Sequence, residues 1–147
     1  MTTNTLTIGP WSQLGTKASQ VRTAVFVHEQ KIPAEMEWDV ADADALHVVL
    51  CNPQGEPVAT GRLLVHAPGV GRIGRMAVLS NLRGSGLGQQ VLEALVQAAR
   101  ARGDTEVCLH AQTSAQGFYE RLGFTKRGDV YAEVGIPHIE MFLDVRQ

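Results

Sequence analysis

Hydrophobic and polar positions along the chain follow two spacings, one typical of helices and one typical of strands. The clearest helical spacing comes after a glycine-rich turn. Its apolar stripe consists of Val91, Leu92, Leu95, Val96 and Ala99. Positions i, i+1, i+4, i+5 and i+8 share one face of a helix, so this segment is predicted to pack that face on a core. Gly103 can adopt the left-handed conformation that ends a helix, and it is the expected end of this one.

Shorter apolar runs, separated by turn residues, predict the strands of one mixed sheet. The predicted strands are Thr5–Ile8, Leu46–Cys51, Val58–Val65, Arg72–Val78, Glu106–Ala111, Phe124–Glu133 and His138–Val145. Turns rich in proline and glycine join the second strand to the third and the third to the fourth. Three strands joined in this way form an antiparallel meander, which an all-parallel nucleotide-binding sheet does not contain.

Two further helices are predicted. One runs from about Thr16 to Val27, and a short one runs from Ser114, its expected N-cap, to Leu122, where Gly123 closes it. Residues 29–44 carry six acidic side chains and a proline but little periodicity, so we expect a loop or a broken helix near a functional surface. No repeat or linker interrupts the pattern, which favours a single α/β domain over residues 1–147.

The composition is that of an ordinary globular protein, with 44% hydrophobic and 19% charged residues and a formal net charge of -2. No basic run is present, which argues against nucleic acid as a partner. Neither a leader nor an apolar run of about 18 residues is visible, so we expect a cytoplasmic protein that is not held by a membrane. Cys51 and Cys108 lie in apolar strand-like runs and are expected to be buried free thiols. The histidines show no ligand spacing, and no metal site is predicted.

Residues 73–96 combine a strand, a glycine-rich turn and a helix, an arrangement that suits the binding of phosphate. Backbone N–H groups can converge on oxygens where side chains are missing, and the helix adds about half a positive charge at its N-terminus. Counted from Gly84, the third glycine of a dinucleotide fingerprint comes one place early, at Gly88. The loop lacks the Gly-Lys-Ser/Thr of a Walker motif. An esterase elbow, Gly-x-Ser-x-Gly, would need glycine two residues before Ser85, where this chain has Arg83. A tight turn without a ligand remains the alternative.

The stretch Arg83-Gly-Ser-Gly86-Leu-Gly88 resembles the signature loop of the GNAT superfamily of acyl-CoA N-acyltransferases, which reads Gln/Arg-x-x-Gly-x-Gly/Ala between a strand and a helix. A later segment, Gln112-Thr-Ser-Ala115-Gln-Gly-Phe118-Tyr119-Glu-Arg-Leu-Gly123-Phe124, resembles the family's Asn-x-x-Ala-x-x-Phe-Tyr-x-x-x-Gly-Phe at every named place but the first. Shorter pieces such as Gly135-Ile-Pro-His138 resemble the ElaA-like branch. The resemblance covers most of the chain. It implies an α/β fold with a mixed, mostly antiparallel twisted sheet of about seven strands, about four flanking helices, and strands splayed at a cofactor cleft.

The resemblance also implies that the chain binds acetyl-CoA or coenzyme A. The residues that it assigns to the cofactor are Met76, Ala77, Val78, Arg83, Gly84, Ser85, Gly86, Leu87, Gly88, Gln89, Gln112 and Phe118. In this family the backbone at Met76 and Val78 holds the pantetheine arm, and the glycine loop holds the pyrophosphate. Gln112 replaces the family's Asn, which keeps the amide but lengthens the side chain by one methylene.

Tyr119 matches the family position that donates a proton to the sulfur of the coenzyme, and a core aromatic beside Phe118 is the alternative. A base must also take a proton from the acceptor ammonium, and a carboxylate or histidine acting through water is the usual device. The candidate bases are Glu37 and His110, followed by Glu35, Asp39 and His138. Several acidic groups at the mouth of the cleft favour a cationic amine over an anionic sugar phosphate.

We therefore predict an N-acetyltransferase that moves the acetyl group of acetyl-CoA directly to a primary amine of a small molecule or a protein, in a ternary complex. A non-catalytic acyl-CoA-binding module, acting as a sensor or partner subunit, is the alternative. The presence of Tyr119 and of several candidate bases favours an enzyme. A nucleotide-binding oxidoreductase is disfavoured by the register of the glycines and by the meander. Members of the family are often dimers, so a homodimer is expected by analogy.

Overall fold

In the computed structural model, which describes residues 3–37 and 39–146, seven strands form one twisted sheet. Met1 and Thr2, at the start of the N-terminal segment, lie outside the described residues. The strands are β1 (Thr5–Pro10), β2 (Leu46–Cys51), β3 (Pro57–Ala67), β4 (Val70–Val78), β5 (Glu106–Gln112), β6 (Thr125–Glu133) and β7 (Ile136–Asp144). Their order in the sheet is β1-β2-β3-β4-β5-β7-β6, and β4 and β5 are parallel while the other pairs are antiparallel. The predicted strands and the meander are confirmed, with ends shifted by at most two residues.

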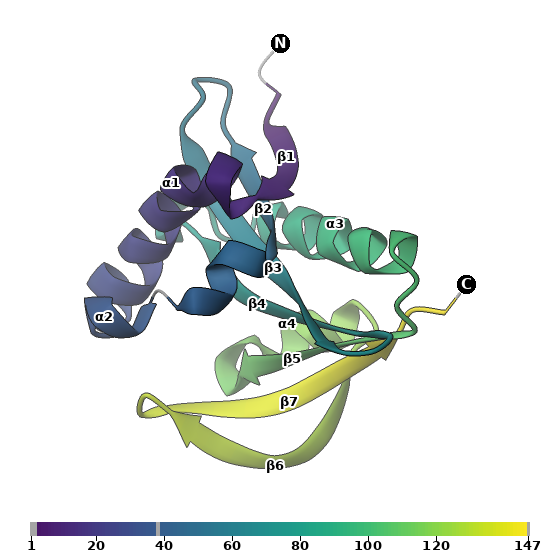
Figure 1. The fold of residues 1–147 in the computed structure, drawn as a ribbon. Helices are drawn as coiled ribbons and strands as arrows, with labels where there is room; N and C mark the ends of the chain where they lie inside the picture. The colour runs from purple at the N-terminus through teal and green to yellow at the C-terminus, as the bar shows by residue number, and fades with distance from the viewer. Residues whose placement is uncertain (1–2, 38, 147) are drawn as a thin grey trace.

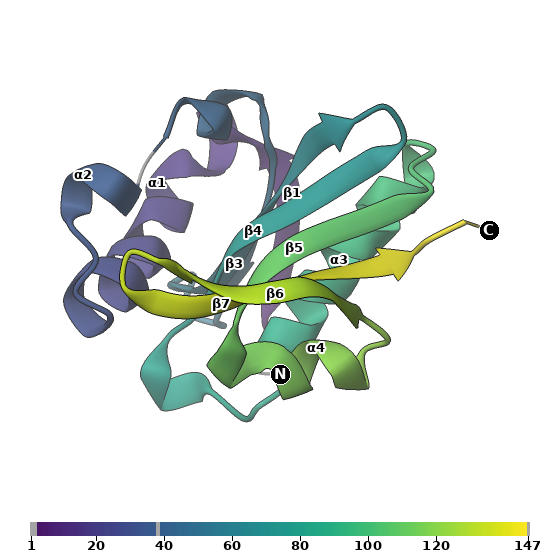
Figure 2. The ribbon, with the colours of Figure 1, turned by 90° about the horizontal axis from the view of Figure 1, so that it is seen from below.

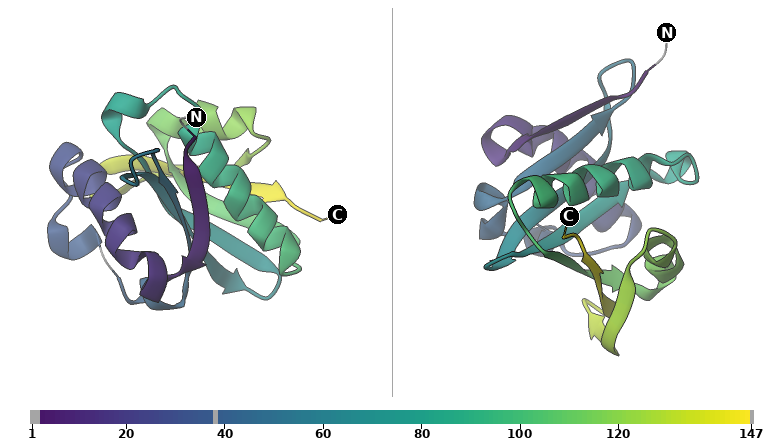
Figure 3. Two further views of the ribbon diagram at one scale, coloured as in Figure 1. Left: turned by 90° about the horizontal axis from the view of Figure 1, so that it is seen from above. Right: turned by 90° about the vertical axis from the view of Figure 1, so that its right-hand side faces the viewer.

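Helices cover both faces of this sheet. They are α1 (Trp11–Arg22), α2 (Ala34–Glu37), α3 (Leu87–Ala101) and α4 (Gln116–Arg121), the π-helix η1 (Thr23–Glu29) that continues α1, and the 3-10 turns η2 (Val40–Asp44), η3 (Ser80–Leu82) and η4 (Thr113–Ala115). Val48 and Leu50 of β2 join the core under α3, while Val49 between them packs against Leu14 and Ala18 of α1. Figures 1 and 3 show α1 and α3 on opposite sides of the strands. Within the described residues, no helix is long and apolar enough to cross a membrane.

The predicted stripe of α3 lies at the centre of the main core. All five of its residues are buried, together with alternate residues of β2 and β5 and with Val58, Ala59 and Leu63 of β3. Gly103 follows the helix with a φ of 93°, in the left-handed region, so the predicted end is confirmed. Cys51 and Cys108 are free and buried, as the apolar runs around them predict.

Two predicted helix starts are wrong. α1 begins at Trp11, five residues before the predicted start at Thr16. Gly15 lowers the helix propensity of this first turn, but a Cβ at Gly15 would lie 2.8 Å from the Trp11 ring, so the glycine makes room for the indole. Ser114 is not an N-cap, because it lies inside η4, and α4 begins two residues later without a side-chain cap.

β4 separates from β5 halfway along its length, and a β-bulge marks the place. The parallel pairing ends at the pair Ile73–Leu109, although β4 continues to Val78. Opposite Gly61 of β3, β4 has two residues, Arg75 and Met76, and Arg75 takes a left-handed φ of 51°. The extra residue also turns the following side chains of β4 to the opposite face. In Figure 2 β4 and β5 are seen from the side where no described helix covers β5, β6 and β7. The separation of β4 from β5 is the predicted splay.

Candidate functional site

A cleft of about 1210 Å³ opens where β4 and β5 separate. On the α3 face of the sheet, its walls are the glycine loop, the first turn of α3 and one side of α4. On the other face, its walls are η1, α2, the turn between β6 and β7, and polar side chains of β3, β4 and β5. Of the predicted cofactor residues, all line this cleft except Ser85, whose hydroxyl bonds the carbonyl of Leu82. Tyr119 and the candidate bases Glu37, His110 and His138 also line it, whereas Glu35 and Asp39 do not. One gap in the sheet therefore connects the loop on one face with titratable groups on the other.

The loop before α3 has the backbone shape that an anion site needs. Gly84 and Gly86 have φ values of 83° and 85°, in the region that favours glycine. A Cβ added at either position would meet no atom within 4 Å, so there is open space beside the loop. Leu87, Gly88 and Gln89 follow in the first turn of α3, where backbone N–H groups lack partners inside the helix and the helix dipole is positive. These features together fit a diphosphate group.

Arg83, the first residue of the loop, is held by other parts of the protein. Its Nη1 and Nη2 donate to the carboxylate of Glu29 at 2.5 and 2.7 Å, and its Nε and Nη2 donate to the carbonyl of Val78 at 3.2 and 3.0 Å. The hydrogen bonds from Arg83 lower the pKa of Glu29. The guanidinium thus fastens the end of η1 to the end of β4, and phosphate would have to compete with Glu29 for it.

Two aromatic residues of α4 form the wall opposite the start of α3. A Cβ at Gly88 would lie 3.4 Å from the ring of Phe118, so this glycine lets the helix approach the ring. Tyr119 is buried, with its ring edge-on to the rings of Phe118 and Phe124 at 5.0 and 5.9 Å between centroids. Burial raises the pKa of Tyr119 to about 12, so the phenol stays protonated. Within the described residues its hydroxyl has no hydrogen-bond partner, which leaves the proton available to a ligand.

Gln112, at the end of β5, is paired across the cleft with Gln30. Its Nε2 donates to Oε1 of Gln30 at 2.9 Å, and Nε2 of Gln30 donates back to Oε1 of Gln112 at 3.4 Å. Gln30 follows the seven-residue π-helix η1 directly, and its backbone N–H bonds the carbonyl of Val25. π-Helices are rare in proteins, and those that occur are often found at functional sites. Here η1 carries Val25 and Phe26 into the cleft wall beside the two amides.

The acidic segment is a broken helix, as predicted, but its carboxylates at Glu29, Glu37, Asp39 and Asp42 are bound to arginines. Glu37 is 8% exposed and forms an ion pair with the buried Arg22, whose guanidinium also donates to the backbone carbonyl of Glu37 at 2.9 Å. Asp42 is fully buried and accepts from Arg22 at 2.8 and 3.0 Å and from Arg62 at 2.8 Å. Burial would raise the pKa of Asp42, but the hydrogen bonds from the two arginines outweigh it and lower the pKa. These charges hold α1, the acidic segment and β3 together.

Asp39 completes this cluster on the cleft side. It accepts from Arg62 at 2.7 and 3.0 Å and lies 3.4 Å from Nη2 of Arg75, and the hydrogen bonds from Arg62 lower its pKa to about 2. Arg75 also donates to the backbone carbonyl of Glu37 at 3.0 Å. Among the three carboxylates predicted to border the acceptor, Glu37 is the one that lines the cleft, and it is already paired. The expectation of several acidic groups at the mouth is therefore wrong for this segment, because Glu37 and Asp39 are paired with arginines and Glu35 does not line the cleft.

A second polar group lies on the part of the sheet that no described helix covers, where β5 meets β6 and β7. Nδ1 of His110 forms a hydrogen bond with the hydroxyl of Tyr131, and the ring of Tyr131 stacks on His138 with 5.9 Å between centroids. Nδ1 of His138 bonds the carbonyl of Ile136 at 2.7 Å, and its Nε2 lies 3.5 Å from Glu133. Burial lowers the pKa of His110, and the charge of Arg72 adds to the effect. His110 is therefore neutral at neutral pH and able to accept a proton.

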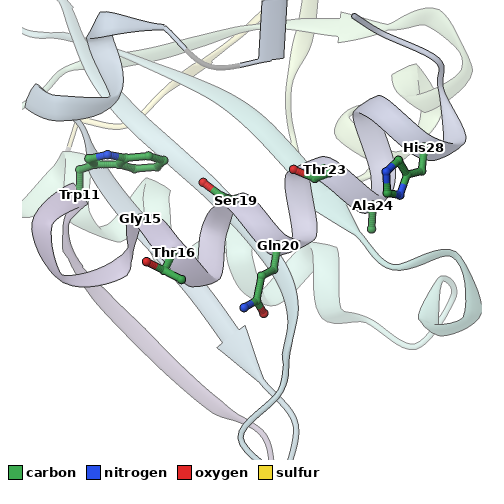
Figure 4. A pocket seen from close by; sticks show the side chains of 8 residues that line it. All are labelled: Trp11, Gly15, Thr16, Ser19, Gln20, Thr23, Ala24 and His28. Atoms are coloured by element: carbon green, nitrogen blue, oxygen red, sulfur yellow. The ribbon is translucent and has the colours of Figure 1, made fainter. Parts of the chain in front are cut away.

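A second hollow lies on the outside of α1 and η1 (Figure 4). The side chains around it, from Trp11 to His28, are spread in a row along the helices and do not converge on one point. Within the part of the chain that the structure describes, no group of three or more His, Cys, Asp or Glu residues is placed to hold a metal ion. The cleft between β4 and β5 therefore remains the candidate site.

Reasoning from the sequence missed Arg72 and Gln30, which line the cleft, and Tyr131, which bonds the cleft residue His110. Arg72 alternates with the core residue Ile73 on a predicted strand, so its position on the cleft face could have been read from the pattern. Gln30 reaches the cleft through a π-helix, and Tyr131 reaches His110 from a strand at the edge of the sheet. Neither of these arrangements leaves a periodic signal in the sequence.

Comparison with known proteins identifies the family. The acetyltransferase (GNAT) domain family matches residues 14–145. Protein ElaA of Escherichia coli is 38% identical over 134 residues, which cover 87% of this chain and 86% of ElaA. The crystal structure of Escherichia coli ElaA superposes with a TM-score of 0.85 and 31% sequence identity, covering 99% of this chain and 100% of that chain. An acyl-CoA N-acyltransferase from Pseudomonas aeruginosa superposes with a TM-score of 0.83 and 40% identity, covering 95% of this chain and 99% of that chain. The predicted resemblance is confirmed, and the chain belongs to the GNAT acetyltransferase family.

Proposed function

We propose that this protein transfers the acetyl group of acetyl-CoA directly to a primary amine, with both substrates bound at once. The observation that carries the proposal is the gap between β4 and β5. It joins an anion-binding loop on one face of the sheet to a neutral histidine on the other. Membership of an acyl-CoA-using family supports a donor of this chemical type. A thioester that reached through the gap would present its carbonyl to an amine on the far side.

The donor half of the cleft fits coenzyme A in three respects. The loop at Gly84 and Gly86 offers open space and the positive end of α3 to the diphosphate. Beyond Ile73, the backbone groups of β4 that point toward β5 have no partner strand in the described structure, so they are available to the amides of a pantetheine arm. Such a backbone N–H can also polarise the thioester carbonyl, and one donor of this kind is typically worth roughly 3 kcal/mol in the transition state.

The proton balance of the reaction is simple. The attacking amine forms a C–N bond to the acyl carbon, the C–S bond breaks, and the amine loses a proton while the sulfur gains one. His110 is our candidate for the group that takes the first proton, directly or through one water, because it is neutral and lines the cleft. Tyr119 is our candidate for the donor of a hydrogen bond to the departing sulfur, because its phenol is protonated and has no partner among the described residues.

Two of the predicted roles change in the light of these contacts. Glu37 is paired with Arg22 in a buried cluster, so we assign it a structural role and leave the base to His110. The amide of Gln112 is paired with Gln30, and we propose that the pair borders the pantetheine arm as one unit. A carboxamide does not take up a proton near neutral pH, so neither amide of the Gln112–Gln30 pair is a candidate base.

A non-catalytic acyl-CoA-binding module is the second candidate. It would use the same glycine loop, but it would have no need of a protonated phenol and a neutral imidazole on opposite sides of the gap. That pairing favours the enzyme. A homodimeric assembly and a cytoplasmic location remain predictions.

Titration calorimetry with acetyl-CoA, coenzyme A and a nicotinamide dinucleotide tests the proposal. We expect micromolar binding of the two CoA species and loss of that binding in Gly86→Trp, because the indole would fill the space beside the loop. Gly55→Trp is the matched control, since Gly55 has a φ of 83° and an equally open surrounding in the turn after β2. Thiol release with a panel of amines then separates an enzyme from a binding module. Binding of neither CoA species would refute both candidates.

A further inference from the structure

Arg72 is a half-buried cation on the acceptor side of the cleft, and within the described residues its side chain has no hydrogen bond and no ion pair. It lies on β4 opposite Leu64 of β3 and Cys108 of β5, on the α1 face of the sheet, next to the part around β5 that no described helix covers. His110 is two residues farther along β5 on the same face, because side chains alternate along a strand. The guanidinium thus lies close to the end of the strand pairing, where the acetyl group is proposed to emerge.

The other cations of this face are already neutralised. Arg62 is bound to Asp39 and Asp42, and Arg75 lies next to Asp39. Arg127 binds two carboxylates that, like Arg72, lie around Cys108 of β5, at 3.0 Å for Glu106 and 2.8 Å for Glu140. The carboxylates nearest to Arg72 in the sheet are therefore engaged elsewhere.

A guanidinium at the wall of a cleft attracts a planar anion, because its N–H groups match the two oxygens of a carboxylate. We propose that the acceptor of this enzyme is a small primary amine that also carries a carboxylate, with the carboxylate bound by Arg72 and the amine directed to His110. This inference rests on the proposed acetyl transfer and names its substrate class. Among the described residues of the acceptor side, Arg72 is the one available arginine, which suits a carboxylate of one charge, whereas a phosphate of nearly two charges would leave part of its charge without a partner.

The other charges of the acceptor side fit an acceptor with two opposite ends. Glu133 lines the cleft at the turn between β6 and β7, and its half-exposed carboxylate lies 3.5 Å from Nε2 of His138. An ammonium group near Glu133 and His110 would lie on the other side of the gap from Arg72. Along β5, the two residues from Cys108, which lies opposite Arg72, to His110 span about 7 Å, which sets the scale of the separation between amine and carboxylate. Short amino acids are the molecules of this size and charge.

Matched pairs of acceptors test the inference. The pairs are glycine and glycinamide, β-alanine and its amide, and γ-aminobutyrate and its amide, with glucosamine and glucosamine phosphate as the phosphate arm. In the wild type we expect at least one carboxylate to exceed its amide about tenfold or more in kcat/KM. Arg72→Gln should raise the KM for that carboxylate about tenfold, bring the pair to within about threefold, and leave the Kd of coenzyme A unchanged. Arg146→Gln, which removes an exposed, paired arginine outside the cleft, should keep the preference.

A second readout does not depend on turnover. The melting temperature of the wild type, with and without coenzyme A, should rise with the carboxylate probes and not with their amides, and Arg72→Gln should abolish the difference. Equal effects of acids and amides on the wild type, or a preference that survives Arg72→Gln, would overturn the inference and leave acetyl transfer intact if coenzyme A still binds. A preference for the phosphate arm alone would also overturn it. If the wild type does not bind coenzyme A, the proposed function itself is refuted.

Discussion

Replacing Tyr119 with phenylalanine removes one hydroxyl from the donor side of the cleft and tests what that hydroxyl does. Burial raises the pKa of Tyr119 to about 12, while a thiol of the coenzyme type has a reference pKa of about 8.5. Complete transfer of the phenolic proton to the thiolate is therefore uphill by about 3.5 pH units, or roughly 5 kcal/mol. Tyr119 should act as a hydrogen-bond donor to the leaving sulfur and not as a full proton donor.

The size of the effect follows from that distinction. A hydrogen bond to a charged group is worth about 1.5–3 kcal/mol, and sulfur is a weak acceptor, so the lower end applies. We expect Tyr119→Phe to lower kcat about tenfold and to leave KM for acetyl-CoA nearly unchanged. Below about pH 10 the pH profiles of kcat for the wild type and the variant should have the same shape, because Tyr119 stays protonated in this range. The fold should tolerate the change, because the hydroxyl has no hydrogen-bond partner in the described structure and the ring contacts with Phe118 and Phe124 remain.

Thiol release measured at saturating acetyl-CoA, from pH 6 to pH 10, is the assay, with the melting temperature as a check on folding. A fall in kcat of a thousandfold or more would refute this reasoning, because general acid catalysis by full proton transfer has effects of that order. No change in kcat at any pH would return Tyr119 to the role of a core aromatic residue. A melting temperature several degrees lower would mean that the hydroxyl serves the fold.

Further predictions concern the charges around the cleft. Arg83→Ala should raise the Kd of coenzyme A less than tenfold in calorimetry, because Glu29 and the Val78 carbonyl already hold the guanidinium; a hundredfold rise would show that the side chain moves to the phosphate. Asp42→Asn should cost about 3 kcal/mol in urea unfolding, since it leaves two buried guanidiniums without their shared carboxylate, and a cost below about 1 kcal/mol would contradict that. His110→Gln should lower kcat about a hundredfold and remove the acid limb from the pH profile of kcat. In the wild type the midpoint of that limb should lie below pH 6.5, because the pKa of His110 is lowered. If the variant keeps the wild-type limb, the base is another residue. Asp39 has a folded pKa of about 2 against 3.8 when unpaired, so its contribution to stability should be complete above about pH 4 and lost between pH 4 and pH 2, and flat stability over that interval would disprove the pairing.

Much of the fold could be predicted because burial on one face imposes a period on the sequence. The stripe of α3 and the alternation along β5 lie in the main core where the pattern places them. The start of α1 could not be predicted, since Gly15 weakens the local signal and its compensation is a contact with the Trp11 ring. The N-cap at Ser114 failed for a related reason. A serine before a helix is only a local preference, and here a 3-10 turn precedes α4.

The two halves of the candidate site differ in how far the sequence could predict them. The donor half depends on consecutive residues, since the left-handed conformations at Gly84 and Gly86 and the first turn of α3 follow one another along the chain. The acceptor half depends on contacts between distant segments. Whether an acidic residue faces a substrate or an arginine cannot be read from its neighbours in the sequence, and Arg22 is 20 residues from Asp42.

The same arginine cluster explains how an unfavourable backbone conformation is held beside the donor site. The left-handed φ of Arg75 costs a non-glycine residue roughly 1–2 kcal/mol. Its guanidinium donates to the carbonyl of Glu37 at 3.0 Å, and a hydrogen bond from a charged group is worth about 1.5–3 kcal/mol, enough to offset that cost. Glu37 is itself anchored by Arg22. The bulge at Arg75 lies where β4 leaves β5. The acidic segment, which in the sequence suggests an acceptor site, therefore helps to keep open the gap through which the donor would reach the acceptor.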